Sequence, residues 1–101
     1  MAFDWNDYIS LAKDLIKSKP TQAQLRSATS RAYYAAFIKC RNNSPYNTVK
    51  GGDVHFRVIS YYKREGASRE ELSVGHNLDS LRIKRNESDY DSRYIAKAME
   101  V

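Results

Sequence analysis

The sequence predicts an all-α domain, an up-and-down bundle of four helices followed by a short C-terminal helix. Three observations lead to this prediction. Apolar residues recur every three to four positions in several long segments, which is the period of an amphipathic helix. Only two prolines and four glycines interrupt the chain, and no segment alternates polar and apolar residues as a strand does. A chain of 101 residues has the length of one domain with one core, so we expect residues 1–101 to form a single unit.

The first helix is expected between Asp4 and Pro20. Asp4 can cap its N-terminus, and Phe3 and Tyr8 have the spacing of a hydrophobic staple. The apolar residues of this segment recur at the spacing that places them on one face: Trp5, Tyr8, Ile9, Ala12, Leu15 and Ile16. Pro20 cannot continue the helix, so the chain should turn there.

The second helix is predicted from Gln22 to about Arg41, because Thr21 and Gln24 form a capping-box pattern and nothing interrupts the segment that follows. Small apolar residues form a stripe that lets a neighbouring helix approach closely: Leu25, Ala28, Ala32, Ala35 and Ala36. Further apolar residues occupy the adjacent faces. We therefore expect this helix to be surrounded, by its own domain or by a second subunit.

A loop of turn-forming residues is expected at 42–52, before the third helix. Asp53 can cap this helix, and Gly66 can end it in a left-handed conformation. The apolar residues of this helix should share one face: Val54, Val58, Tyr61 and Tyr62.

Ser68 and Glu71 form another capping box, which predicts the start of a fourth helix. Its buried stripe should contain Val74, Leu78 and Leu81, and Gly75 should mark a kink or a close contact with another element. A last, short helix is predicted from about Ser92 to the end of the chain, with four apolar residues: Tyr94, Ile95, Ala98 and Met99.

Composition restricts the classes of function. The formal net charge of +5 is compatible with a nucleic-acid partner without requiring one. Cys40 is the only cysteine, so a reduced thiol is expected and neither an intramolecular disulfide nor a cysteine-rich zinc site can form. The two histidines are not at metal-ligand spacing, and no glycine-rich phosphate loop occurs, so we expect no metal and no cofactor.

No apolar run is long enough for a membrane span and charge begins at Asp4, which predicts a cytoplasmic protein without a signal peptide or a membrane partner.

The end of the fourth helix carries the most unusual residues, in the motif LRIKRNESDYD. Its apolar stripe continues at helical spacing to Arg85, and an arginine there is costly to bury unless it is paired. Asp89, four residues later, is the nearest candidate partner. One interpretation is a polar cleft that presents Arg85 and Asn86 to a phosphate or a protein partner. The other is a helix end stabilised by an Arg85–Asp89 ion pair with Tyr90 packed beneath it.

Other candidate site residues lie outside that stripe. Arg82 shares a face with the polar residues of the motif. Arg31 and Tyr34 could bind nucleobases, because aromatic side chains beside basic ones stack bases, although tyrosines within a long helix also serve as core or dimer contacts. His55 falls in the first turn of the third helix, where the helix dipole disfavours its charged form, and it could act as a general acid or base. His76 is the second histidine of this kind.

Four segments, FDWNDYISLAKDL, LRSATSRAYYAAF, HFRVISYYKREG and LDSLRIKRNESDYD, occur in the order found in proteins with a HEPN domain, and the chain resembles that family over nearly its whole length. HEPN proteins are small prokaryotic helical bundles, often encoded beside minimal nucleotidyltransferases. The resemblance implies a bundle of four or five helices that forms a homodimer, usually through the face carrying the second and fourth helices. Members usually have a full last helix after DYD, so we expect a shortened one here.

Many HEPN proteins are metal-independent ribonucleases, often the toxin of a toxin–antitoxin pair, with a motif of an arginine, a polar residue and a later histidine. Arg85 and Asn86 match the start of that motif, and Tyr90 stands at the position of the histidine. The chain is most similar to the branch that has RNxxDY in place of the histidine motif. A tyrosine, with a pKa of about 10, is a poor replacement for an imidazole in proton transfer near neutral pH.

Three hypotheses follow. The first, which we favour, is a homodimeric RNA- or nucleotide-binding protein with weak or no catalytic activity, paired with a nucleotidyltransferase in a toxin–antitoxin-like system. The second is an active metal-independent endoribonuclease that uses Arg85 and Asn86, with Tyr90 or His55 as the proton-transfer group. The third is a purely structural interaction module in which Arg85 and Asp89 form a stabilising pair.

Overall fold

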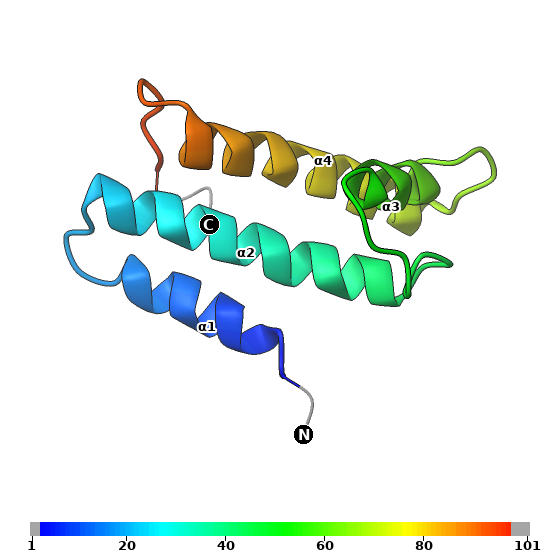
Figure 1. Ribbon diagram of the computed structural model, residues 1–101, viewed down its shortest axis with the longest axis horizontal. Helices are drawn as coiled ribbons and strands as arrows, with labels where there is room; N and C mark the ends of the chain where they lie inside the picture. The colour runs from blue at the N-terminus through cyan, green and yellow to red at the C-terminus, as the bar shows by residue number, and fades with distance from the viewer. Residues whose placement is uncertain (1–2, 98–101) are drawn as a thin grey trace.

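The computed structural model describes residues 3–97 and confirms the predicted all-α fold. Its helices are α1 (Asn6–Leu15), α2 (Gln22–Asn42), α3 (Val54–Tyr62) and α4 (Arg69–Tyr90), and this part of the chain contains no strand. Figure 1 shows α1, α2 and α4 running side by side with α2 in the middle, while the short α3 packs beside the first half of α4. Within residues 3–97, no helix is long and apolar enough to cross a membrane.

Both capping boxes form as predicted. At the start of α2, Thr21 Oγ1 accepts a hydrogen bond from the Gln24 amide at 3.2 Å, and the Thr21 amide donates to Gln24 Oε1 at 2.8 Å. At the start of α4, Ser68 and Glu71 make the same reciprocal pair at 3.1 and 3.0 Å. These bonds satisfy backbone N–H groups that have no partner within the helix, and they fix where the two long helices begin.

Part of the small-residue stripe of α2 packs closely against a neighbouring helix, as predicted, and this neighbour is α1. Ala12, Ala28 and Ala32 are buried together in the contact between the two helices. Because these side chains are small, the two helix axes can lie close to each other. The Phe3 and Tyr8 rings lie 5.2 Å apart, which is consistent with the expected hydrophobic staple at the start of α1.

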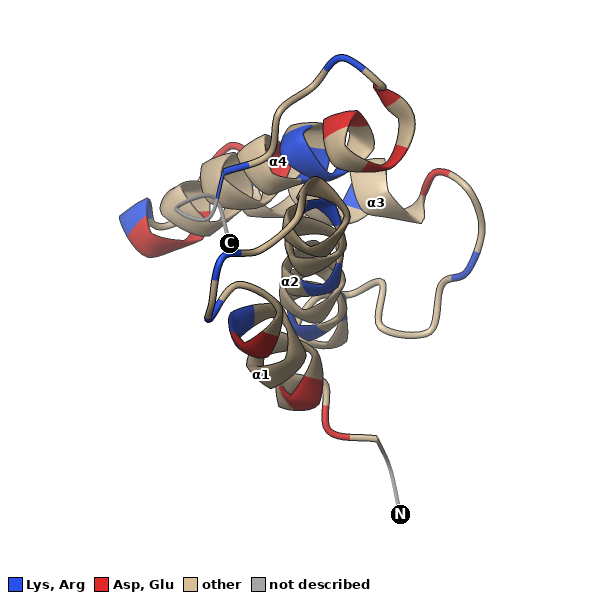
Figure 2. Ribbon diagram, turned by 90° about the vertical axis from the view of Figure 1, so that its left-hand side faces the viewer, with Lys and Arg blue, Asp and Glu red and all other residues tan. Residues whose placement is uncertain are grey.

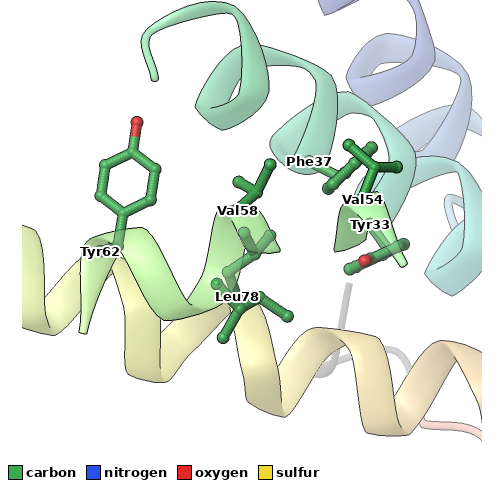
Figure 3. Close-up of a cluster of buried hydrophobic side chains, with 7 residues drawn as sticks. Tyr33, Phe37, Val54, Val58, Tyr62 and Leu78 are labelled. Atoms are coloured by element: carbon green, nitrogen blue, oxygen red, sulfur yellow. The ribbon is translucent and has the colours of Figure 1, made fainter. Parts of the chain in front are cut away.

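The main core lies between α2, α3 and α4 (Figure 3). Its buried residues come from all three helices: Tyr33, Phe37, Val54, Val58, Ile59, Tyr62 and Leu78. Gly75 makes the close contact that the sequence predicted, because a Cβ atom there would lie 2.6 Å from Lys63 Cγ and 3.1 Å from Tyr62 Cβ. The absence of a side chain at Gly75 therefore lets the end of α3 lie directly against α4.

Three local predictions are wrong. The carboxylate of Asp53 does not cap α3, since it pairs with Arg57 at 3.0 Å. Gly66 has the predicted left-handed conformation, with φ of 86°, but the third helix already ends at Tyr62, so Gly66 lies in the turn beyond it. Val74 is 38% exposed and is not part of the buried stripe, because it lines a shallow depression between α2 and α4.

The predicted short C-terminal helix is also wrong over the described residues, because 91–97 are irregular. Side chains of α2 bind the backbone groups that a helix would use. The Gln22 amide pairs with both the N–H and the C=O of Ala96 at 3.0 Å. Arg26 donates to the carbonyls of Ser88, at 3.0 Å, and Tyr94. The segment is thereby docked on the start of α2 in a non-helical form; Ala98 and Met99 lie outside the described residues.

Candidate functional site

Two adjoining cavities form a groove between α3 and α4, which we call the α3–α4 groove. The first, of about 340 Å³, is lined by residues of the loop before α3, of α3 itself and of α4: Gly51, Gly52, His55, Arg82, Arg85 and Asn86. The second, of about 450 Å³, shares three of them and extends along α3: Gly52, His55, Phe56, Ile59, Ser60, Lys63, Asp79 and Arg82. The shared residues show that the two cavities are continuous.

Arg85 is held in place by three side chains. Its side chain is only 15% exposed, its Nη1 donates to Asn86 Oδ1 at 2.6 Å, and its Nη2 donates to the hydroxyl of Tyr34. Asp89 Oδ2 lies 3.3 Å from the buried Nε, which is an ion-pair distance without hydrogen-bond geometry. The predicted i,i+4 pair is therefore present. A guanidinium fixed in this way faces the groove. Because its side chain is already ordered, it loses little further conformational entropy when an anion binds.

His55 approaches the same cavity from α3. Its ring stacks on Phe37 with the centroids 3.9 Å apart, and its Nδ1 lies 2.6 Å from the Tyr33 hydroxyl. Burial and the nearby guanidinium groups of Arg85 and Arg82 hold the pKa of His55 below its usual range. Burial raises the pKa of Tyr33, so its phenol stays neutral. His55 is thus an uncharged imidazole at neutral pH, with Nε2 making no hydrogen bond to any described residue.

Arg82 and Lys63 share one carboxylate in the second cavity. Asp79 Oδ1 lies 3.2 Å from Arg82 Nη2, and Asp79 Oδ2 lies 3.6 Å from Lys63 Nζ. All three side chains are about one-third exposed, so these pairs contribute little stability and leave the cations accessible. With Arg85 added, three cations line or adjoin the groove against one lining carboxylate, Asp79.

The remaining predicted site residues lie outside the groove lining. Tyr34 contacts Arg85 from α2 and Asp89 pairs with it, so both position the guanidinium. Tyr90 is 78% exposed, so it is not buried beneath the ion pair as predicted, but its ring centroid lies 5.9 Å from Arg85 Cζ. Arg31 is exposed with its guanidinium 5.1 Å from the Tyr8 ring centroid, on the α1 side of α2. His76 is exposed on α4 and lines neither cavity.

Sequence reasoning missed several groove residues. Phe56, Ser60, Lys63 and Asp79 were not identified as site residues, yet all four line the second cavity. One signal was available for Phe56: it lies off the apolar face of its own helix, where a large aromatic side chain is exposed without a structural reason. Gly51 belongs to the predicted loop of turn-forming residues, and it was not identified as a site residue. Its backbone, with φ of 126°, lies at the wall of the first cavity.

The groove has the properties of an anion site. Arg85 and Arg82 offer guanidinium donors, Asn86 offers an amide, and the N-terminus of α3 adds the partial positive charge of a helix dipole. In residues 3–97 no cluster of three His, Cys, Asp or Glu side chains could hold a metal ion. Figure 2 shows basic and acidic residues together on α1 and α4, whereas α2 and α3 carry basic residues and no acidic ones. Because basic residues also lie outside the groove, its concave geometry distinguishes it from the rest of the surface.

Comparison with known proteins finds a distant relative. No protein-family model matches the chain, and no solved structure matches it. An uncharacterized protein of Methanocaldococcus jannaschii, MJ0992, is 24% identical in an alignment that covers 88% of this chain and 61% of the relative. The chain thus spans about three fifths of the length of that protein. Since the relative is uncharacterized, the similarity assigns no activity to either protein.

Proposed function

We propose that the chain is a HEPN-like protein that binds the phosphate groups of single-stranded RNA or of a nucleotide in the α3–α4 groove. One observation carries the proposal: Arg82, Arg85, Asn86 and His55, from two separate helices, line a single cavity of about 340 Å³. An arginine fork and an amide beside a helix N-terminus suit phosphate oxygens. The match of Arg85 and Asn86 to the HEPN motif independently selects the same two residues.

The homodimer and the nucleotidyltransferase partner belong to the same proposal. A shallow apolar depression of about 180 Å³ between α2 and α4 supports the dimer, and its lining includes Cys40, Val74 and Leu81. Val74, placed on the buried stripe by its spacing, is exposed in the single chain and would be covered by a second copy. Light scattering should therefore give twice the chain mass, and Val74→Asp should shift the protein to the monomer; a monomeric wild type would contradict the dimer.

Binding is tested with a fluorescein-labelled single-stranded RNA in EDTA, by anisotropy at several salt concentrations. Arg82→Ala should weaken binding and reduce the slope of log Kd against log salt, because one phosphate contact is lost. Arg57→Ala is the matched control, since it removes the same charge from an arginine of α3 that is paired with Asp53 and lines neither cavity. Equal loss in the two variants would show that overall charge, and not the groove, attracts the RNA.

Arg85→Gln tests the residue that the motif and the structure both select. The variant keeps a polar side chain with N–H donors but removes the charge, and a thermal melt establishes that it folds. We expect weaker RNA binding than for Arg82→Ala, because Arg85 is the more buried and better oriented guanidinium. Wild-type affinity in a folded Arg85→Gln variant would refute the phosphate site.

The position of His55 favours a second candidate function, a metal-independent endoribonuclease. RNA cleavage of this type removes the proton of the ribose 2′-hydroxyl, whose oxygen then attacks the adjacent phosphorus. The bond between phosphorus and the 5′-oxygen breaks, which leaves a 2′,3′-cyclic phosphate, and the 5′-oxygen takes up a proton from the protonated base or from water. A neutral imidazole with a lowered pKa is a competent base for that proton, and Arg85 would stabilise the charge on the phosphate oxygens. His55 would thus supply the imidazole that the motif lacks at Tyr90.

The two functions are separated by incubating RNA with the protein in EDTA. An active ribonuclease should cleave RNA but not the matching DNA, which has no 2′-hydroxyl. His55→Gln should abolish cleavage, and it should weaken RNA binding less than Arg85→Gln does, because both guanidinium groups remain. Tyr90→Phe should leave cleavage unchanged if His55 is the base. Binding without cleavage in the wild type supports the first function and excludes the second.

A further inference from the structure

Phe56 is the most exposed aromatic side chain of α3 and lies at the wall of the second cavity. It is 72% exposed, whereas its neighbours Val54 and Ile59 are buried in the core. Its exposure is therefore not compensated by packing against the rest of the described chain. Exposed aromatic rings beside basic groups are the surfaces on which proteins stack unpaired nucleobases.

The surroundings of Phe56 suit a base and not merely an apolar ligand. The cavity of about 450 Å³ also contains the hydroxyl of Ser60 and the carboxylate of Asp79, which can hydrogen-bond to the edge of a base. Its size lies in the range of small-ligand sites. The cavity thus combines one aromatic face with a few polar groups, as a nucleobase site requires.

The second cavity directly continues the proposed phosphate cavity. His55 and Arg82 line both, so a ligand that fills the two would pass beside these side chains. A nucleotide has this layout, with a flat base joined through a ribose to a phosphate. The spatial order along the groove is Asn86 and Arg85 first, then Arg82 and His55, then Phe56.

We propose that Phe56 forms a stacking platform for a nucleobase of single-stranded RNA whose adjacent phosphate lies against Arg82 and Arg85. This inference rests on the proposed function and adds the substrate class: an unpaired strand, bound through a base and its phosphate together. Duplex RNA would bind less well, since its bases are stacked on one another and unavailable to Phe56.

The test compares two labelled oligonucleotides of equal length and equal phosphate number, oligouridine and an abasic ribose-phosphate strand. The wild type should bind oligouridine more tightly by about tenfold, within a range of roughly 5- to 150-fold for one stacked base. Phe56→Ala should remove that preference and leave the abasic affinity unchanged. Phe56→Trp should retain or increase the preference, because the platform is kept.

Ile95→Ala serves as the matched control, because Ile95 is also an exposed apolar residue, at 68%, but lies in the C-terminal segment docked on α2. It should behave as the wild type with both strands. Light scattering of Phe56→Ala tests the competing explanation that Phe56 lies in a contact between subunits, since loss of such a contact would change the oligomeric state. A change in oligomeric state with an unchanged base preference would overturn the platform.

The outcomes distinguish the two proposals. If the wild type binds both strands equally and Phe56→Ala does the same, the base site is refuted while the phosphate groove stands. If the wild type binds neither strand, the proposed function and the base site both fail. If the wild type and Ile95→Ala prefer oligouridine and only Phe56→Ala loses this preference, the phosphate groove and the base site are both supported.

Discussion

Replacing Gly75 with alanine tests how α3 is held against α4, and therefore how His55 is brought to the groove. Two effects oppose each other. Alanine in place of glycine within an exposed helix adds about 1 kcal/mol of stability, because the unfolded chain loses conformational freedom. Forcing an extra methyl group into a packed contact removes about 1–3 kcal/mol.

The distances decide which effect is larger. The new Cβ would lie 2.6 Å from Lys63 Cγ, and this side chain can rotate away. It would also lie 3.1 Å from Tyr62 Cβ and 3.2 Å from Tyr62 C, and these atoms cannot move without the helix. Tyr62 is fixed by burial and by its hydroxyl bond of 2.9 Å to the Cys40 carbonyl. The overpacking term should therefore exceed the helix-propensity gain, with a net loss of about 1 kcal/mol.

The assay is thermal and urea unfolding followed by circular dichroism at the helix band. For a domain of this length, a loss of about 1 kcal/mol lowers Tm by about 4–8 °C. Gly52→Ala is the control, since no atom lies within 4 Å of a Cβ added there, and this variant should be neutral or slightly more stable. A Gly75→Ala variant as stable as Gly52→Ala would refute the claim that Gly75 sets the α3–α4 distance.

Three further predictions concern single side chains. The pKa of His55 in the folded state is lowered from 6.5, so the unfolded chain binds the proton first as the pH falls. The free energy of unfolding, measured with urea, should therefore fall as the pH drops below about 6.5. In His55→Gln this part of the fall should disappear. Arg26→Ala should lower the free energy of unfolding by about 1.5–3 kcal/mol and speed hydrogen exchange of the Ala96 amide, because two carbonyls lose a charged donor. Lys17→Ala, at an exposed residue in the turn after α1, should do neither. Burial raises the pKa of Cys40, so its thiol should react with iodoacetamide at pH 7 more slowly than free cysteine does. Unfolding in urea should remove this difference in rate, whereas a native protein that reacts as fast as free cysteine would contradict the burial of Cys40.

Local signals in the sequence predicted the helices well. The capping boxes at Thr21 and Ser68 join residues three positions apart, and the Arg85–Asp89 pair joins residues one helical turn apart. Interactions at such spacing are set by helix geometry alone, so a sequence is sufficient to predict them.

The contacts that the sequence did not predict join residues far apart in the chain. His55 meets Arg82 and Arg85 only because α3 packs on α4 at Gly75, and the sequence indicated a close contact there without naming the partner helix. The C-terminal segment has apolar spacing typical of a helix, yet Gln22 and Arg26 bind its backbone from α2. Tertiary hydrogen bonds of this kind override local periodicity.

The most direct test of the central claim is an NMR titration of the ¹⁵N-labelled protein with a short single-stranded oligouridine in EDTA. We predict that the largest chemical-shift changes fall on the amides of residues 51–56 and 82–86, from both walls of the α3–α4 groove, and that they disappear in Arg85→Gln. Shift changes confined to α1 and the exposed face of α2, or absent altogether, would contradict a phosphate site between α3 and α4.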